Sequence, residues 1–478
     1  MRRVHGSRGI SHVYPNAGCN KTRFRLNFVL MKQVYMDTFG CQMNVADSDR
    51  MELLLFHSGF ARTSHLEEAD LILVNTCSVR EKAEQKIFSL FGGMRPLKRA
   101  NPDLVMGVTG CLAQQEGERL LKRIPFLDFI LGPDHIEDIP QAVDRALETQ
   151  QPFIWNDFDK KKNYSIPEVS ANRPLANPSA FINIIKGCDK FCSFCVVPHT
   201  RGREKSREAA EIYNEVRQLV ARGAKEIILL GQNVNAYGKH GLETPVAFHQ
   251  LLYGIAGIPG VKRLRFTTSY PNDFTPELIQ AYRDLDILVN HLHLPAQSGN
   301  NRILREMRRG NTVEEYLALS DALQTGVPDI ELTSDIIVGY PGETESEFED
   351  TLRFMERVGF SSSFMFCYSP RPGTPAASLL DNVSEPVKKE RLQKTMACQN
   401  ELTRVQGEKY LGKEVEVLIE GRSPRKNGGF KGRNPQFWRV NFSGDESGLQ
   451  AGDLVNVVVD EVSGHALKGR ASVTLDPI

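Results

Sequence analysis

The sequence predicts an α/β fold in three parts: an N-terminal doubly wound parallel-sheet domain, a central partial (β/α)6 barrel and a small C-terminal all-β barrel. Strand-like runs alternate with helical patterns over residues 32–150 and again over residues 174–404. Residues 407–474 instead hold short β-type runs separated by glycine-rich turns. Alternating strands and helices favour parallel sheets, whereas consecutive short strands favour a small barrel.

Composition narrows the class of protein. The chain has 478 residues, too many for one ordinary core. Its 59 basic residues balance 59 acidic residues, so any nucleic-acid surface must be a local patch. No apolar run is long enough to span a bilayer, and no membrane partner is expected. Nine cysteines in so long a chain favour metal binding in a reducing cytoplasm over a secreted disulfide scaffold.

Residues 1–31 are expected to form a disordered leader, because they are basic and the first acidic residue is Asp37. In the domain that follows, three strand-like runs each end at a cysteine: VYMDTFGC at Cys41, LILVNTC at Cys77 and VMGVTGC at Cys111. The carboxyl ends of parallel strands lie along one edge of a sheet, so these three cysteines, the N-terminal triad, can meet in space. The alternative is three ordinary core cysteines.

The polar segment 151–173 is predicted to be a linker that leads into the central barrel. After it, six strand candidates are mostly separated by amphipathic helical stretches. Six such units make an open or partial barrel, whose active face lies at the strand C-termini. The candidates are AFINIIKG, EIILLGQ, RLRFTTS, HLHLPA, ELTSDIIVG and SSFMFCYS.

A second set of three cysteines follows the first barrel strand. Cys188, Cys192 and Cys195, the barrel triad, form a C-x3-C-x2-C loop. Three thiolates on a four-iron cluster leave one iron open to a ligand that is not protein, so two such sets predict two 4Fe–4S clusters engaged in chemistry. A zinc site completed by His199 is the competing interpretation, although such sites usually stabilise small domains that do not fold without the metal. Cys367, in the last strand candidate, is expected to lie in the core.

The C-terminal segment carries a basic stretch. Residues 421–444 contain no acidic residue, and aromatic side chains are interleaved with the basic ones. Basic side chains bind phosphates and aromatic faces stack on unpaired bases, so this stretch predicts RNA binding. The alternative for Trp438 is that it fills the barrel core. The basic residues are Arg422, Arg425, Lys426, Lys431, Arg433 and Arg439, and the aromatic ones are Phe430, Phe437 and Trp438.

Several segments resemble one known family closely. Gly187–Cys195 (GCDKFCSFC), at the end of a barrel's first strand, resembles the radical S-adenosylmethionine (SAM) superfamily. Three N-terminal cysteines combined with a C-terminal β module resemble the methylthiotransferases, whose last module is the TRAM domain. Gly40–Asn44 (GCQMN) and Leu229–Tyr237 (LLGQNVNAY) resemble the branch that acts on tRNA, the tRNA-2-methylthio-N6-dimethylallyladenosine synthases. The resemblance covers residues 32–474 and all six cysteines of the two triads.

This resemblance implies a division of labour between the triads. The barrel triad is implied to hold a 4Fe–4S cluster that binds and cleaves SAM, and the N-terminal triad an auxiliary 4Fe–4S cluster whose open iron carries the sulfur. A first SAM is implied to methylate that sulfur, and a second to start the radical step. The methylthio group then goes to C2 of N6-isopentenyladenosine at tRNA position 37.

Contacts to SAM and tRNA follow from positions in the implied barrel. Ordinary turn geometry is the alternative for the glycines, and a solvated basic face is the alternative for the arginines. Arg201, Arg203 and Arg371 are expected to face the tRNA or line the substrate mouth. The residues expected to contact SAM are Gly231, Gln232 and Asn233 at its methionine end, and Gln297, Ser298, Gly339 and Glu343 near its ribose or adenine.

The implied partners are a tRNA that carries N6-isopentenyladenosine, a reduced flavodoxin or ferredoxin-type electron donor, and iron–sulfur assembly carriers. A cytoplasmic monomer is expected. Two rival functions remain open from the sequence. One is modification of threonylcarbamoyl-adenosine or of a ribosomal-protein aspartate by the same family, and the other is a zinc-containing RNA-binding protein without catalysis.

Overall fold

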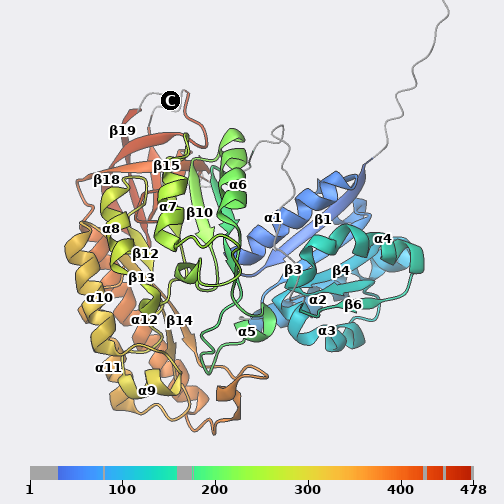
Figure 1. Cartoon of the computed structure of the whole chain (residues 1–478), viewed down its shortest axis with the longest axis horizontal. Coiled ribbons are helices and arrows are strands. Elements are labelled where there is room, and N and C mark those ends of the chain that lie inside the picture. Colours follow the sequence, from blue (N-terminus) through green and yellow to red (C-terminus); the bar gives the residue numbers. More distant parts are fainter. Residues whose placement is uncertain are drawn as a thin grey trace, which may run out of the picture.

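The computed structural model describes residues 31–78, 81–158, 175, 177–423, 428–444 and 448–474. The leader up to residue 30, most of the segment 151–173 and the basic residues Arg425 and Lys426 lie outside these ranges. The described chain forms three bodies, with the N-terminal domain beside the central barrel and the C-terminal barrel above one end of it (Figure 1). None of the described helices combines the length and apolar character needed to cross a membrane.

The N-terminal domain is a six-stranded parallel sheet in the order β2-β1-β3-β4-β5-β6. Alternate residues of its central strands point to opposite faces. Leu71 and Leu73 pack with helices α1 and α4, whereas Ile72 and Val74 pack with α2 and α3. The sheet is therefore doubly wound, as predicted. Its elements are β1 Lys32–Phe39, α1 Gln42–His57, β2 Phe60–Thr63, η1 Leu66–Glu68, β3 Leu71–Thr76, α2 Glu81–Ala100, β4 Val105–Gly110, α3 Cys111–Arg123, β5 Phe129–Leu131, η2 Pro133–Asp138, α4 Ile139–Thr149 and β6 Phe153–Trp155.

The last strand of this sheet differs from the expected domain boundary. Strand β6 pairs in parallel with β5, although it lies inside the segment 151–173 that was predicted to be a linker. Three residues flanked by polar and proline residues leave no periodic pattern to recognise. The sheet therefore extends beyond residue 150.

Six parallel strands form the central barrel in two three-stranded sheets, β7-β10-β11 and β12-β13-β14. The sheets meet where Leu264 bridges to Leu288, and their outward side chains share one core with the surrounding helices. This is the predicted partial (β/α)6 arrangement. The strands are β7 Ser179–Asn183, β10 Glu226–Leu230, β11 Arg263–Phe266, β12 His291–His293, β13 Glu331–Val338 and β14 Ser362–Cys367, and the short pair β8 Ile185–Lys186 and β9 Lys205–Ser206 flanks the cysteine loop.

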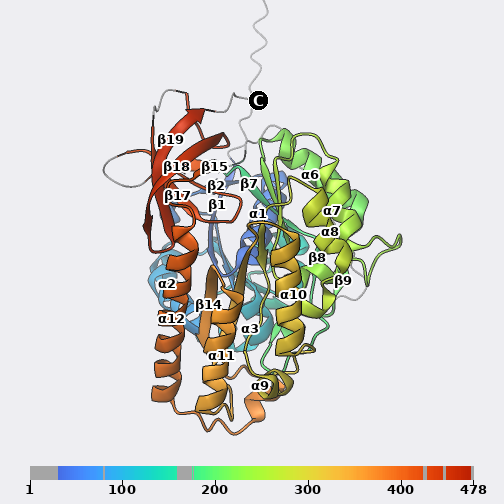
Figure 2. The same ribbon diagram turned by 90° about the vertical axis from the view of Figure 1, so that its left-hand side faces the viewer.

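The barrel helices are α5 Val197–Thr200, α6 Ala209–Ala221, α7 Phe248–Ala256, α8 Pro276–Asp284, α9 Asn301–Glu306, α10 Val313–Gly326, α11 Glu345–Val358 and α12 Glu385–Glu408, with short turns η3 Val234–Ala236, η4 Pro271–Asp273 and η5 Pro375–Ser378. Helix α12 lies beside α11 and runs up to the C-terminal barrel (Figure 2). The expected boundary between residues 404 and 407 therefore falls inside one continuous helix.

The C-terminal body is a closed five-stranded barrel, β15-β16-β17-β19-β18. Its seam with the central barrel is polar: the indole Nε1 of Trp438 donates to both carboxylate oxygens of Glu331, at 3.0 and 2.8 Å. Trp438 is 6% exposed and belongs to the barrel core, so it offers no face for stacking on a base. The strands are β15 Glu414–Arg422, β16 Phe430–Arg433, β17 Arg439–Ser443, β18 Leu454–Ser463 and β19 Ala466–Thr474.

Candidate active site

A cavity of about 420 Å³ opens between the N-terminal domain and the C-terminal ends of the barrel strands. Helix α3, which begins at Cys111, contacts α5, which follows the barrel triad, at this junction. Residues that are far apart in the sequence therefore meet around one space. All six predicted cysteines line it: Cys41, Cys77, Cys111, Cys188, Cys192 and Cys195.

The register of the N-terminal sheet assembles the N-terminal triad. Phe39 at the end of β1 pairs with Thr76 at the end of β3, and Thr76 pairs with Gly110 at the end of β4. Each cysteine follows its strand by one or two residues, so the three reach the same edge. Gly110 has φ +94°, and a Cβ there would lie 2.4 Å from the backbone oxygen of Thr76. Only glycine fits this turn into α3.

Two buried asparagines fix the start of α1 against the end of β3. Asn44 Nδ2 donates to Asn75 Oδ1 at 2.9 Å, and Asn75 Nδ2 donates to the backbone oxygen of Asn44 at 2.8 Å. Asn44 Oδ1 also accepts from the Cys41 thiol at 3.3 Å. The asparagine in the GCQMN segment thus positions the cysteine that precedes it.

The barrel triad sits on a loop that is closed at its base. Strands β8 and β9 pair on either side of it, and the Cys188 amide donates to the Gly202 carbonyl at 3.1 Å. Gly187 has φ +80°, and a Cβ there would lie 2.1 Å from the backbone oxygen of Arg203. Arg309 Nη1 reaches the sulfur of Cys192 at 3.6 Å. The loop therefore presents its thiols to the cavity with a guanidinium at one of them.

The spacing of the sulfurs distinguishes the two metal interpretations. A single zinc ion, about 2.3 Å from each sulfur, would draw its thiolates to within about 3.8 Å of one another. In the described part of the chain, the group of three ligand atoms found within 4.8 Å of one another is Asp189, Glu204 and His240, which contains no cysteine. His199, the expected fourth zinc ligand, does not line the cavity. In neither triad do all three sulfurs lie within 4.8 Å of one another, a spacing that favours a four-iron cube, which spreads its thiolates over separate metal atoms.

Burial of the thiols also favours a positively charged occupant. Burial raises the pKa of Cys111, and it raises the pKa of Cys188 and of Cys195 to about 12. A hydrogen bond with Cys77 lowers the pKa of Cys41 to about 6. Thiolates in such surroundings need a strong cation, which an iron–sulfur cluster supplies. The residues present therefore fit a cluster at each triad.

Comparison with known proteins agrees with this geometry. Residues 33–132 match the Uncharacterized protein family UPF0004, residues 182–355 the Radical SAM superfamily and residues 408–472 the TRAM domain. A protein of Syntrophotalea carbinolica named tRNA-2-methylthio-N(6)-dimethylallyladenosine synthase is 43% identical over 90% of this chain and 96% of its own length. One with the same name from Ectopseudomonas mendocina is 43% identical over 92% of this chain and 98% of its own length.

The chain belongs to the tRNA-2-methylthio-N(6)-dimethylallyladenosine synthase family. This confirms the predicted family and its cofactor class, SAM with 4Fe–4S clusters. Among solved structures, the radical SAM methyltransferase TsrM from Kitasatospora setae has a TM-score of 0.52 at 15% identity, covering 72% of this chain and 74% of that one. That likeness shows the fold alone.

The residues expected to contact SAM divide into two groups. Gly231, Gln232, Asn233 and Gln297 line the cavity. Gln297 has φ +79°, and its strained backbone is held by amide hydrogen bonds to and from β13. Asn233 Oδ1 is buried with no hydrogen-bond partner in the described chain, so it remains available to a ligand.

The other three expected SAM contacts lie away from the cavity. Ser298 is 1% exposed and hydrogen-bonds Thr351. The Glu343 carboxylate turns back to the Gly339 amide at 2.7 Å and pairs with Arg391 at 2.9 Å. These residues stabilise the loops after β12 and β13 from behind.

Several cavity residues were not identified as such from the sequence, and three of them carry groups that matter for binding. Arg309 and Lys190 lie 4.4 and 4.6 Å from the centroid of the Tyr270 ring, which brings two cations to one wall. Cys367, expected in the core, lines the cavity at the end of β14, while its thiol donates to the backbone oxygen of Lys388 in α12 at 3.4 Å. These residues line the cavity because of the way the loops pass over the strand ends. The spacing of residues in the sequence does not reveal that loop conformation.

The arginines expected to face tRNA have three different environments. Arg371 lines the cavity. Arg203 is exposed and pairs with Asp189 at 2.6 Å. Arg201 also lines the cavity, where it is 4% exposed and pairs with Asp47 of the N-terminal domain, so it lies inside the junction of the two domains and its contact with RNA stays a prediction. The basic segment HTRGREKSR contains three arginines, and nothing in its sequence distinguishes the buried Arg201 and Arg207 from the exposed Arg203.

Proposed function

We propose that this protein is a radical SAM methylthiotransferase that inserts a methylthio group at C2 of N6-isopentenyladenosine at tRNA position 37. One observation carries the proposal: two triads of thiols, each short of a fourth protein ligand in a cube, face a single cavity. The family membership supports the substrate and the product, because the relatives carry the name of that reaction.

The cysteines take separate roles in this proposal. The barrel triad holds the cluster at which SAM binds, and the N-terminal triad holds the auxiliary cluster that carries sulfur. When bound, these cofactors supply radical chemistry for an aromatic C–H bond that no side-chain base can deprotonate. The chain supplies position, since both triads are anchored on strand ends of packed sheets.

The remaining cavity residues would bind and orient SAM. Arg309 is a cation suited to a carboxylate, whereas the neighbouring Lys190 is already paired with Asp273 at 2.8 Å, and Asp335 supplies an anionic group elsewhere on the lining. The buried and unpaired Asn233 Oδ1 is an acceptor for an ammonium or a hydroxyl. Phe366 and Tyr368 line the side along β14, where they exclude water and offer faces to an adenine ring.

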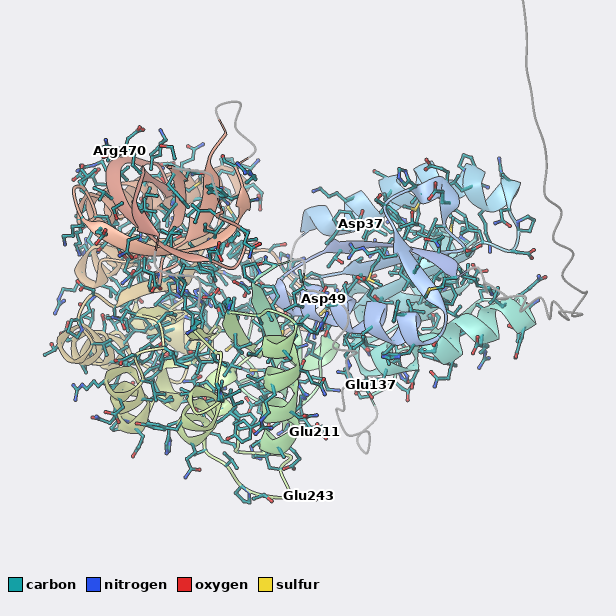
Figure 3. The ribbon with its side chains drawn as sticks, turned by 90° about the horizontal axis from the view of Figure 1, so that it is seen from above. Asp37, Asp49, Glu137, Glu211, Glu243 and Arg470 are labelled. Carbon is teal, nitrogen blue, oxygen red and sulfur yellow. The ribbon has the colours of Figure 1, made fainter. Side chains whose placement is uncertain are left out.

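The C-terminal barrel would bind the tRNA through its outer face. Inward residues of β16, β17 and β19 build the core, and the residues between them point outward. Figure 3 shows Arg470 on this outer surface, away from the N-terminal domain. Such a patch binds phosphates although the whole chain has no net charge. The outward basic residues are Lys431, Arg439, Lys468 and Arg470, of which Lys468 pairs with Glu461 and Arg470 with Asp460, whereas Arg433 pairs with Glu420 and lies over Phe437 at the seam with the central barrel.

The other partners follow from the proposed chemistry. A reduced flavodoxin or ferredoxin-type protein would supply electrons, and iron–sulfur carriers would load the clusters. We place the reaction in the cytoplasm, where tRNA is modified, and in a monomer, because one chain brings both triads to the cavity.

Mass spectrometry of tRNA nucleosides tests the function. Cells that lack the gene should accumulate N6-isopentenyladenosine without its methylthio group, and expression of this chain should restore the modified nucleoside. Unchanged methylthio content, with loss of a modification on threonylcarbamoyl-adenosine or a ribosomal-protein aspartate, would overturn the assignment. Anaerobically purified protein should contain iron and acid-labile sulfide, whereas zinc without sulfide would eliminate the enzyme.

A further inference from the structure

A buried charge network joins the N-terminal domain to the barrel beside the cavity. Arg201, just after α5, donates from Nη2 to Asp47 Oδ2 at 2.7 Å and from Nε to the sulfur of Cys111 at 3.2 Å. The side chains of Arg201 and Asp47 are 4% and 2% exposed. Asp47 lies on α1, the helix that carries labelled Asp49 at the junction of the two domains (Figure 3). The guanidinium therefore comes from one domain, and both of these acceptors come from the other.

The Arg201 guanidinium is buried, and this makes its contacts energetically important. A guanidinium removed from water is tolerated only when anions or acceptors surround it. Asp47 supplies one anion, and its Oδ1 also accepts from Asn183 Nδ2 of β7 at 3.2 Å. The sulfur of Cys111 supplies the second contact. Arg201 is satisfied in this way only while the domains are docked.

The contact to Cys111 acts on the cofactor site itself. Hydrogen bonds to the sulfurs of an iron–sulfur cluster, and fixed charges near it, set its reduction potential. Reduction adds one negative charge, which a cation at hydrogen-bond distance stabilises. The Asp47 carboxylate, which accepts from Nη2 on the same edge of the guanidinium, opposes part of that effect.

We propose that Arg201 is a positioning residue that acts through Cys111. It fixes the N-terminal triad against the barrel, and it makes the cluster on that triad easier to reduce than the three thiolates alone would. This inference rests on the proposed function, because it needs a cluster at Cys41, Cys77 and Cys111. The arginine that follows the barrel triad thereby tunes the opposite triad.

The chain offers a matched control for domain docking. Lys186 Nζ pairs with Asp134 Oδ1 at 2.6 Å, and these side chains are 11% and 5% exposed. This pair joins the same two domains, yet neither residue lines the cavity. Asp134→Asn therefore weakens the junction without changing a charge at the N-terminal triad.

The test is a redox titration followed by electron paramagnetic resonance. It uses the full-length chain with Cys188, Cys192 and Cys195 changed to Ala, so that the N-terminal cluster alone gives a signal. We expect Arg201→Gln to shift the potential to more negative values, Asp47→Asn to shift it to less negative values, and Asp134→Asn to leave it unchanged. Limited proteolysis of the same proteins should show looser docking in all three variants.

Opposite shifts from the two partners of one ion pair cannot arise from a structural role alone. If Arg201→Gln does not hold a cluster, Arg201→Lys keeps the charge and should give a smaller negative shift, and Asp47→Asn decides independently. Shifts of the same sign, or none in either variant, would overturn the inference. Absence of a cluster at the N-terminal triad in the parent protein would instead overturn the proposed function.

Discussion

The barrel triad lies within eight residues of chain, whereas the N-terminal triad draws its cysteines from three separate strand–helix units. The first is shaped by a loop that β8 and β9 close at its base, and the second by the register of β1, β3 and β4. A triad formed by one short loop should keep its geometry when residues elsewhere in the domain are substituted. A triad formed by three strand ends should lose its geometry when the packing or register of the sheet changes. The two triads should therefore fail separately, and from different causes.

The largest expected effect is a difference in which reaction step is lost when cysteines of one triad or the other are replaced. Replacing Cys188, Cys192 or Cys195 with Ala should reduce SAM cleavage to background, because the cluster that binds SAM is lost. Replacing Cys41, Cys77 or Cys111 should leave SAM cleavage measurable and stop sulfur insertion. Chromatography of 5′-deoxyadenosine and mass spectrometry of the tRNA product measure the two steps. Equal loss of SAM cleavage from both sets, with the barrel cluster intact, would refute the division.

Gly110→Ala should damage the N-terminal triad alone. The new Cβ would meet the backbone of Thr76 at 2.4 Å in a conformation that only glycine adopts, so we expect a loss of about 1–3 kcal/mol in unfolding free energy. Iron content should fall to that of the barrel cluster, with SAM cleavage retained. Gly92→Ala in α2, where a Cβ has open space, is the control and should be about 0.5–1 kcal/mol more stable than the parent. Denaturant unfolding and iron analysis measure these changes.

Gly187→Ala should produce the reverse pattern. Its Cβ would lie 2.1 Å from the Arg203 carbonyl, which opens the base of the cysteine loop without touching the N-terminal sheet. We expect loss of SAM cleavage and of one cluster's iron, while the N-terminal cluster keeps its spectrum. A variant that lost both clusters together would show that the triads are not independent.

The smallest expected effect is on acid stability and concerns the barrel only. The Arg302 guanidinium lowers the pKa of Glu347 to about 2, so the pair stabilises the fold above the ordinary carboxyl pKa and loses that contribution as pH falls toward 2. At pH 7, Glu347→Gln should cost the apo-protein about 0.5–1 kcal/mol. The difference from the parent should shrink between pH 4.5 and pH 2 in denaturant titrations. An unchanging difference would contradict the assigned cause.

Periodicity and motif spacing predicted most of the elements, β6 excepted, and the six cysteines, because both depend on where strands end. They could not predict which loop residues turn inward. Glu343 follows its strand as expected, yet its carboxylate is held by Gly339 and Arg391 behind the loop. Arg201 and Arg203 are two residues apart and look alike in sequence, but only one meets a carboxylate from another domain. Such pairings form only when the domains pack together, and they produce no repeating pattern in the sequence from which they could be predicted.

The contact between Glu331 and Trp438 fixes the C-terminal barrel on the central barrel, and this has a consequence for which substrates can react. Strand β13 extends from this seam toward the cavity, and α12 braces the same two bodies from outside. The proposed RNA-binding surface of the C-terminal barrel and the cavity are therefore held at a fixed distance from each other. We expect that an RNA whose target base lies at a different distance from the segment bound by that surface would not react, even if the base itself were correct.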